Sequence, residues 1–503
     1  MAEPSEAQRN PADISVEVLI VGAGFSGLCM GIRLLQAGMK DFLIIEKSED
    51  VGGTWYENRY PGCACDVPSH LYSYSFERNP GWTRMYASQP EIWEYLKSCV
   101  QRYGLAPYIR LGTRFCEATW DEAASLWRIT AGDNLRIHAR VLVSGIGALH
   151  VPRYPEIPGL ERFGGPAFHS AEWRPDVDLT GKTVAVIGTG ASAIQFVPQI
   201  VPRAGKLYLF QRTPAWIVPR RDFGISEKWR KRFENVPGLM WAFRKFLFFS
   251  LEWRVLSFLG NRRVRKHFEG IARRHLEKSI ADPKLRAKLT PNYEIGCKRI
   301  LVSDDFYPSL EQPNVELVAE KIAEIRPKSI VTSDGAERAA DVLIFGTGFQ
   351  VTEAFLGMRL FGRGGFALHD AWRNGMSAYL GVSVSGFPNF FILLGPNTGL
   401  GHNSVVLMIE AQVGYVMECL KLMRRKKIAV MEVRAESQQH FVANIRDRMS
   451  QTVWQSGGCR SWYQDSKTGE NTALWPGSVI NYMHRTRTVA DGEYDLKPAE
   501  RTN

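Results

Sequence analysis

Short and almost unbroken apolar runs recur along the chain, and each of them leads into glycine. The runs at 16–21, 140–144, 183–187 and 341–345 consist mainly of valine, leucine and isoleucine. Runs of this length are typical of strands that are buried on both faces of a parallel sheet. Helical periodicity follows the first and the third run. This alternation predicts an α/β fold with two doubly wound, Rossmann-like dinucleotide-binding units.

The first run ends in a dinucleotide-binding motif, Gly22-Ala23-Gly24-Phe25-Ser26-Gly27, and a predicted helix over 26–37 follows. Such glycines admit a pyrophosphate close to the backbone, and the helix N-terminus holds its charge. The next predicted strand, 41–46, ends in Glu46. A carboxylate at this place accepts hydrogen bonds from free ribose hydroxyls, as FAD presents them. Together these elements predict an FAD-binding unit.

A second motif of the same kind follows the strand at 183–187. It is Gly188-Thr189-Gly190-Ala191-Ser192-Ala193, with alanine at a position where the motif permits it. Where the first unit carries Glu46, this one carries Arg212, followed by Thr213. A guanidinium in place of the ribose-binding acid favours a 2′-phosphate, and hence NADPH over NADH. The alternative is a surface arginine beside a turn.

Between the two motifs lies a run of aromatic and small residues. It contains Phe163, Gly165, His169 and Trp173 in the pattern Phe-x-Gly-x-x-x-His-x-x-x-Trp. The plain alternative is a linker between domains whose aromatic side chains pack. With a nucleotide-binding motif on each side, the run resembles the fingerprint of Baeyer–Villiger monooxygenases, flavoenzymes that insert oxygen beside a ketone. One position departs from the family pattern, because Arg174 stands where Pro or Asp is common.

The segment after Glu46 combines glycines with large aromatic side chains. Its candidates for flavin contact are Gly53, Thr54, Trp55, Tyr60, Asp66 and Tyr72. Glycines let the backbone approach an isoalloxazine ring, and aromatic rings can lie against it. Asp66 follows a tight turn in an aromatic setting, where a carboxylate needs a cationic partner. A turn or cap aspartate is the alternative. The whole segment resembles the flavin-contacting part of the same family.

Cys297-Lys298-Arg299 matches the family segment that reaches back to the flavin. On that match Arg299 is the catalytic arginine, Asp66 orients it, and Lys298 helps to hold the 2′-phosphate. Judged from the residues alone, the two adjacent cations are a solvated pair on an exposed loop.

Three further positions take their roles from the resemblance. It implies that Gln195 reaches the bridging phosphates and that the glycine loop around Asn397 closes over the flavin. It also implies that Trp462 lies on a mobile loop that touches NADP, and a core tryptophan is the alternative.

The pattern changes over 222–292, where long helical segments are rich in basic and aromatic residues. A helical cap over a substrate pocket, ordinary helix packing and an amphipathic membrane-surface face are the open interpretations. The family's insertion at this place favours the cap. We therefore expect an FAD-binding domain at 1–150 and 388–503, which includes the C-terminal loop. An NADPH-binding domain at 151–221 and 293–387 is expected to be inserted in it.

Composition limits the partners, the metal sites and the cellular location that we expect. In 503 residues, Lys and Arg exceed Asp and Glu by 11, which suits anionic cofactors. No nucleic-acid-binding motif is present, so a nucleic-acid partner is not expected. Eight cysteines without a Cys-x-x-Cys pair predict reduced thiols and no metal site. The first residues form a loose tail without signal-peptide features, so a cytoplasmic protein is expected. Charges interrupt the apolar run at 239–259, which argues against a membrane span. The oligomeric state is left open.

The resemblance covers nearly the whole chain. It implies an enzyme that uses FAD, NADPH and O2 to turn a ketone into an ester or lactone through a C4a-peroxyflavin. An N- or S-oxygenating flavin monooxygenase is the alternative enzyme, because it needs neither Trp173 nor the pair of Asp66 and Arg299. A flavin-binding regulatory or membrane-surface protein without turnover is the alternative outside enzymes.

Overall fold

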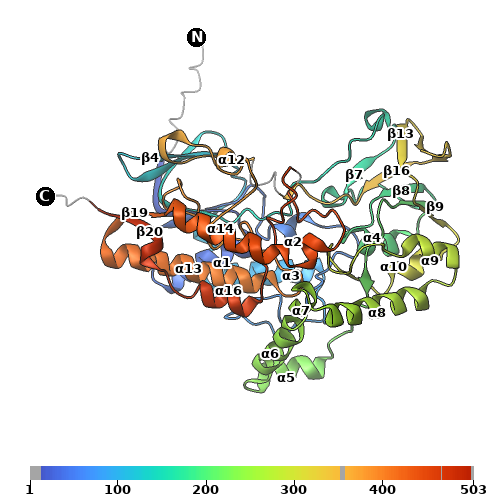
Figure 1. Ribbon diagram of the computed structural model, residues 1–503, viewed down its shortest axis with the longest axis horizontal. Helices are drawn as coiled ribbons and strands as arrows, with labels where there is room; N and C mark the ends of the chain where they lie inside the picture. Colours follow the sequence, from blue (N-terminus) through green and yellow to red (C-terminus); the bar gives the residue numbers. More distant parts are fainter. Residues whose placement is uncertain (1–12, 352–356, 466, 500–503) are drawn as a thin grey trace, which may run out of the picture.

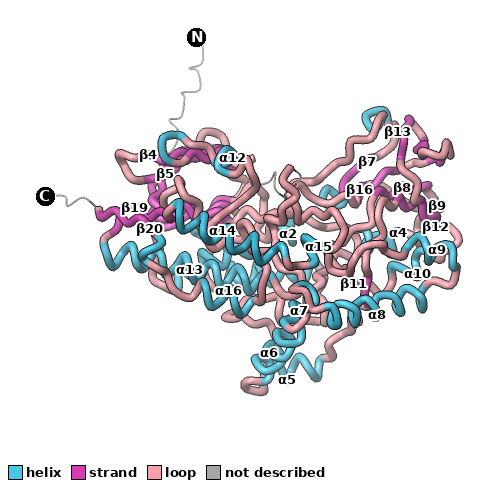
Figure 2. The backbone as a smooth tube through the Cα atoms, viewed as in Figure 1, coloured by secondary structure: helices cyan, strands magenta, loops and turns pink. Residues whose placement is uncertain are grey.

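Two large sheets with flanking helices organise the chain, and a helical segment projects from their junction (Figure 1). The computed structural model describes residues 13–351, 357–465 and 467–499. The tail expected at the N-terminus lies largely outside these residues. Figure 2 shows that much of the region between the sheets consists of loops, and the colours of Figure 1 show that these loops come from distant parts of the sequence.

The first sheet has the order β17-β4-β5-β6-β1-β2-β3, and β18 pairs with β6. Its strands are β1 (Asp13–Val21), β2 (Phe42–Ile45), β3 (Ile109–Arg110), β4 (Phe115–Asp121), β5 (Leu126–Ala131), β6 (Leu135–Ser144), β17 (Arg359–Phe361) and β18 (Phe390–Ile392). The central strands β1, β2 and β6 are parallel, whereas β4, β5 and β6 pair antiparallel. The last four residues of β1, 18–21, are buried on both faces, as the apolar run predicts.

Helices cover one face of the first sheet. Helix α1 (Phe25–Gln36) starts inside the first glycine motif and packs along α13 (Val405–Lys426). Neighbouring elements are α2 (Thr54–Glu57), α3 (Gln89–Arg102), α14 (Ala435–Ser450), α15 (Val453–Ser456), α16 (Val479–Arg485) and the antiparallel pair of β19 (Ile428–Val433) and β20 (Tyr494–Pro498). The predicted helix over 26–37 is therefore confirmed to within one residue at each end.

The second sheet is entirely parallel, in the order β12-β9-β8-β16-β7. Its strands are β7 (Ala167–His169), β8 (Thr183–Ile187), β9 (Lys206–Phe210), β12 (Val315–Val318) and β16 (Val342–Phe345). Close to it are α4 (Ala193–Ile200), α10 (Phe306–Leu310) and the antiparallel strands β13 (Ile322–Arg326), β14 (Ser329–Thr332) and β15 (Glu337–Ala339). Both predicted doubly wound units are thus present.

The segment expected to be helical leaves and rejoins the second unit at one place. Strand β10 (Ile217–Val218) precedes it, and β11 (Leu301–Val302) follows it and pairs with β10 in parallel. Between them lie α5 (Glu227–Asn235), α6 (Leu239–Glu252), α7 (Val255–Phe258), α8 (Arg262–Ser279) and α9 (Pro283–Leu289). No helix in the described part of the chain has both the length and the apolar character for crossing a bilayer.

The expected end of the NADPH-binding domain at 387 lies too far along the chain. Strand β17 pairs in parallel with β4 of the first sheet. Leu360 and Trp372, the latter just after α12 (Leu368–Ala371), are buried in the same cluster as Trp127 of β5. The chain therefore returns to the first unit soon after β16. Apolar pattern alone does not reveal this, because it marks a segment as buried without naming what buries it.

The expectation that all cysteines are reduced is also wrong for two of them. Cys297 and Cys459 form a disulfide across 162 residues of sequence. Cysteine spacing could not reveal this pair, because the fold brings the end of the helical insertion against the C-terminal loop. The other cysteines, all within the described residues, are free thiols.

Candidate active site between the two nucleotide-binding units

The first glycine motif is shaped so that side chains cannot be added to it. A β carbon on Gly22 (φ +99°) would lie 2.7 Å from the carbonyl oxygen of Gly145, and one on Gly27 would lie 1.8 Å from that of Gly22. Helix α1 begins directly behind this loop, at Phe25 and the buried Ser26. The loop thus keeps its backbone bare at the helix N-terminus, as a pyrophosphate site requires.

Glu46 stands at the carboxyl end of β2, beside this loop. Its side chain is buried, and its carboxylate oxygens accept hydrogen bonds from the backbone N–H of Ala23 (2.7 Å) and Ser48 (3.0 Å). The carboxylate is therefore fixed next to the motif, where the sequence predicts a ribose.

A second glycine pair brings the predicted flavin segment onto the motif. A β carbon on Gly53 (φ +53°) would lie 3.1 Å from the Cα of Gly24. Thr54 follows and is exposed, whereas Trp55 is buried and donates from Nε1 to the hydroxyl of Tyr72 at 3.2 Å. Burial raises the pKa of Tyr72 well above its usual range, so this phenol stays protonated.

Arg299 and Asp66 form an ion pair in the region between the two units. Arg299 donates from Nε to Oδ2 of Asp66 at 3.0 Å and from Nη2 to the same oxygen. The side chains keep 35% and 26% of their surface exposed. The negative charge of Asp66 raises the pKa of Arg299, so the guanidinium is charged at every accessible pH. The two residues, 233 positions apart, meet as the resemblance implies.

Tyr463 is a site residue that sequence analysis passed over in favour of its neighbour Trp462. Its side chain is buried, and burial raises the pKa of its phenol to about 12, although the charge of Arg299 opposes this. Trp462 is 42% exposed, and its ring centroid lies 4.3 Å from that of Tyr463. The sequence Ser461-Trp462-Tyr463 indicated that this loop contacts the site, but it did not indicate which of the two aromatic side chains is buried.

The disulfide joins the two loops that meet at this place. Cys297 lies two residues before Arg299, and Cys459 lies four residues before Tyr463. The N–H of Glu294 also donates to the carbonyl of Gly457 at 3.1 Å. The loop with the candidate catalytic arginine is therefore linked covalently to the C-terminal loop.

The second glycine motif repeats the geometry of the first. A β carbon on Gly188 (φ +109°) would lie 2.4 Å from the carbonyl oxygen of Gly346. Thr189, Gly190, Ala191 and Ser192 then lead into α4, and Gly190 and Ala191 are exposed. The loop thus presents an open face to solvent.

Arg212 and Lys298 gather positive charge near this second motif. Arg212 follows β9 and is exposed, and Thr213 beside it is half-buried. The pKa of Lys298 is lowered by burial and by the positive charge of Arg212. The two cations therefore repel each other across one site, and a phosphate between them would relieve this repulsion.

Gln195 lies where the two units touch rather than in the open motif. Its Oε1 accepts from the hydroxyl of Tyr60 (2.9 Å) and the N–H of Ala64 (3.3 Å), and its Nε2 donates to the carbonyl of Ala64 (3.0 Å). Both ends of the amide thus bind the first unit, so the side chain joins α4 to the segment before Asp66.

Asn397 adopts a left-handed backbone conformation (φ +56°) in its glycine loop. Its Nδ2 donates to the carbonyl groups of Asn471 (2.9 Å) and Leu474 (3.2 Å). Its side chain therefore ties the loop to the C-terminal segment.

The fingerprint run forms the edge of the second sheet. A β carbon on Gly165 would lie 2.2 Å from the carbonyl oxygen of Asp341, so this position tolerates only glycine. His169 ends β7 fully buried, its Nδ1 accepts from the N–H of Ala171 (3.1 Å), and burial lowers its pKa. Phe163 packs in the apolar cluster under the same sheet.

Trp173 links this edge to the first unit through a chain of rings. Its centroid lies 5.5 Å from that of Phe196 on α4, which lies 6.1 Å from that of Tyr60. Arg174 points to solvent and pairs with Asp176 (2.5 Å), so its departure from the family pattern does not touch this packing. The run is thus a packed connection between the two units.

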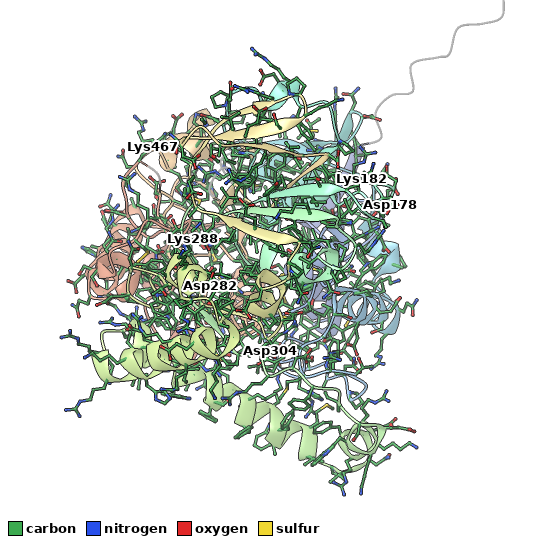
Figure 3. The ribbon with its side chains drawn as sticks, turned by 90° about the vertical axis from the view of Figure 1, so that its right-hand side faces the viewer. Asp178, Lys182, Asp282, Lys288, Asp304 and Lys467 are labelled. Carbon is green, nitrogen blue, oxygen red and sulfur yellow. A yellow bond between two sulfur atoms is a disulfide. The ribbon has the colours of Figure 1, made fainter. Side chains whose placement is uncertain are left out.

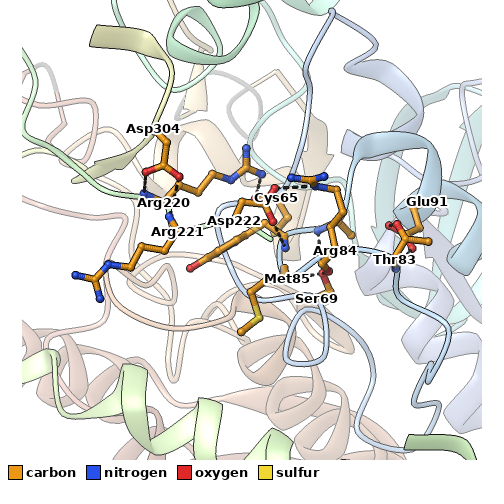
Figure 4. Close-up of polar contacts among 12 residues, drawn as sticks. Cys65, Ser69, Thr83, Arg84, Met85, Glu91, Arg220, Arg221, Asp222 and Asp304 are labelled. Atoms are coloured by element: carbon orange, nitrogen blue, oxygen red, sulfur yellow. Dashed lines mark hydrogen bonds and ion pairs between the residues drawn. The ribbon is translucent and has the colours of Figure 1, made fainter. Parts of the chain in front are cut away.

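Residues 220–222 hold the loop before Asp66 against the second unit (Figure 4). Arg220 donates from Nη2 to the carbonyl of Cys65 at 3.0 Å, and Arg84 pairs with Asp222 at 2.9 Å. Asp304 accepts from the N–H groups of residues 220 and 221. A cleft of about 490 Å³, lined by both units, lies here. The sequence offered no signal for these contacts.

Comparisons with known proteins agree with this architecture. The flavin-binding monooxygenase-like family model matches residues 15–361, and the chain belongs to this family. A Baeyer–Villiger monooxygenase of Pseudomonas aeruginosa is 48% identical over 95% of this chain and 91% of its own length. The resemblance noted in the sequence is thereby confirmed.

Solved structures extend the comparison to the whole fold. A cyclohexanone monooxygenase from Rhodococcus sp. Phi1 bound to NADP+ has 28% identity and a TM-score of 0.87, covering 97% of this chain and 100% of that one. OTEMO in complex with FAD and NADP has 29% identity and a TM-score of 0.85 at the same coverage.

Proposed function

We propose that this protein is an NADPH- and O2-dependent Baeyer–Villiger monooxygenase that contains FAD and converts ketones into esters or lactones. The ion pair of Arg299 with Asp66, held between the two nucleotide-binding units, is the observation that carries the proposal. The family and the relatives named above support the activity and both cofactors. The cytoplasmic location stays a prediction.

The residues present fit both cofactors. FAD would lie on the loop 22–27, with its ribose at Glu46 and its ring system near Gly53 and Trp55. Gly22 and Gly27 fit this role, because a β carbon at either position would collide with backbone and the loop therefore carries no side chain there. NADPH would lie on the loop at 188–193, with its 2′-phosphate between Arg212 and Lys298. When bound, FAD accepts a hydride from NADPH and activates O2 for attack on the ketone carbonyl.

Arg299 supplies a permanent positive charge in a partly water-excluded place, where it stabilises developing negative charge more than it would in water. Asp66 fixes the guanidinium through Nε and Nη2, and it leaves Nη1 without a partner among the described residues. Asp66 is therefore a positioning residue for Arg299. Gln195 and Arg220 hold the segment on which Asp66 stands.

The test is turnover of a mixed panel of ketones, amines and sulfides by the FAD-loaded enzyme with NADPH, with products identified by mass spectrometry. Esters or lactones are expected from the ketones. Exclusive formation of N- or S-oxides would replace the proposal by the alternative enzyme.

The Arg299→Ala variant tests the role of the pair. We expect loss of ester formation by at least about 100-fold, consistent with removal of a charge that acts on the reacting oxygen, while NADPH still reduces the flavin. Arg128→Ala removes an arginine from an exposed pair with Asp121 and is the matched control. Normal esterification by Arg299→Ala would remove this residue from the mechanism.

A further inference from the structure

Helix α6 carries a stripe of large apolar side chains on its outer face. Trp241, Phe246, Phe249, Trp253 and the following Leu256 are all exposed, with exposed fractions of 56%, 66% and 57% for the first three. Their spacing places them along one side of the helical segment 241–256. Soluble proteins rarely leave such a contiguous apolar surface in water, and those that do use it for binding.

The inner face of the same helix is anchored firmly. Arg244 is buried and donates from Nη1 to the carbonyl of His70 (2.6 Å) and from Nη2 to that of Ser73 (2.9 Å). Eight residues later, the buried Glu252 accepts from Nδ2 of Asn403 at 2.7 Å. The helix therefore holds its apolar stripe outward in a defined orientation.

Positive charge surrounds the stripe. Residues 226–266 contain eleven Lys and Arg but three Glu, and of these Arg244 and Glu252 are buried. Lys245 lies 5.8 Å from the ring centroid of Trp241, and Arg232 on α5 lies 5.0 Å from that of Trp229, which is also exposed. Lys228, Lys231, Arg262 and Arg263 are exposed as well.

The surface projects from the rest of the molecule. Helices α5 and α6 lie at the lower margin, away from both sheets (Figure 1), and the view of Figure 3 shows them below Asp304. The surface continues onto α16, where Ile480 and Met483 are exposed and the N–H of Ile480 donates to Glu252 at 3.2 Å.

We propose that the outer face of α5 and α6 docks on anionic lipid bilayers, with the aromatic stripe at the level of the headgroups. Tryptophan and phenylalanine favour this interface, and lysine and arginine around them attract anionic lipid. A second copy of the chain is a poor occupant, because it would place two strongly basic faces against each other. Contact with the bilayer is interfacial and does not depend on the activity proposed above.

Co-sedimentation of the FAD-loaded full chain with vesicles tests this proposal. We expect binding to vesicles of phosphatidylcholine mixed with phosphatidylglycerol, and little binding to phosphatidylcholine alone or in high salt. The double variant Phe246→Ser/Phe249→Ser should lower the partition coefficient by about tenfold or more. Phe366→Ser, which changes an exposed phenylalanine of the first unit, should leave it unchanged.

Charge reversal provides an independent arm. Lys245→Glu/Arg262→Glu/Arg263→Glu should abolish binding to the anionic vesicles, because each exposed cation contributes about fivefold to the affinity and each reversal also adds a repulsive charge. Lys321→Glu/Lys328→Glu, which reverses two exposed charges beside strand β13 and away from the stripe, is the control. Retained flavin absorbance and thermal unfolding in every variant show that the fold is intact.

Either of two results would overturn the proposal. Bilayer docking would be excluded if the wild-type protein did not bind anionic vesicles, or if the stripe variants bound them with an unchanged partition coefficient. A dimer in light scattering that Phe246→Ser/Phe249→Ser dissociates, together with no vesicle binding, would make the stripe a self-association surface instead.

Discussion

The two nucleotide-binding motifs have the same backbone geometry but differ in the residue that we expect to contact the ribose. In each, the first glycine faces the carbonyl of a glycine at the exit of a neighbouring strand, Gly145 for the first motif and Gly346 for the second. The first unit then offers the buried carboxylate of Glu46, whereas the second offers the exposed guanidinium of Arg212. We therefore expect both loops to bind a pyrophosphate, and we expect these two side chains to distinguish a ribose with free hydroxyls, as in FAD, from a ribose with a 2′-phosphate, as in NADPH.

The largest effect on cofactor binding is expected where the first motif has no space for a side chain. In Gly27→Ala the new β carbon would overlap the carbonyl oxygen of Gly22, and overpacking of this kind costs about 1–3 kcal/mol or more. We expect loss of flavin absorbance and a lower melting temperature. Gly190→Ala is the matched control, because its β carbon would lie 3.7 Å from the nearest atom, the oxygen of Gly346. A Gly27→Ala variant that retains FAD would show that the loop relaxes.

The disulfide is a feature of the second nucleotide-binding site that the first site lacks in the described part of the chain, because Cys297 tethers the loop that carries Lys298. Cys297→Ser should lower stability by about 2–5 kcal/mol, since the bond closes a long loop of the unfolded chain. Thermal unfolding with and without a reducing agent measures this. Cys459→Ser should have the same effect, and the double variant should add nothing further. Cys116→Ser, at an exposed free thiol, is the control. Unequal effects of the two single variants would indicate roles beyond the bond.

Arg212→Ala should weaken the second site selectively. Loss of a charge-assisted contact to phosphate costs about 1.5–3 kcal/mol, so KM for NADPH should rise by roughly 10-fold to 100-fold. KM for NADH, which lacks the 2′-phosphate, should change little. Steady-state kinetics with both coenzymes separate the two effects, and an equal rise for both would contradict the assignment.

The smallest effect concerns pH. The pKa of Lys298 is lowered in the folded protein, so its charge is lost as pH rises through a value below that of an ordinary lysine. Because a phosphate binds the charged form, KM for NADPH should begin to rise at this lower pH. In Arg212→Ala one cause of the lowering is removed, so the onset should move to higher pH. KM for NADH should stay flat over the same range, and a parallel rise would exclude Lys298 as the titrating group.

Prediction from the sequence succeeded where the requirement is local. The apolar runs that became β1, β8 and β16 and the helix that became α1 were identified from neighbouring residues. It failed at the boundary before β17 and for the state of Cys297 and Cys459, because both depend on a partner far along the chain. The resemblance implies that Gln195 reaches the bridging phosphates. In the structure Gln195 lies at the junction of the two units, and its amide binds Tyr60 and Ala64.

By itself, then, the sequence determined the two glycine loops, the strands that carry them and the charges that follow. Positive φ angles and burial on both faces are demands that a residue and its neighbours express directly. Only the tertiary structure decided which atoms of Arg299 contact Asp66, that Tyr463 rather than Trp462 turns inward and that the stripe on α6 stays exposed. These contacts join loops from distant parts of the chain, so the residues next to each position in the sequence do not reveal them.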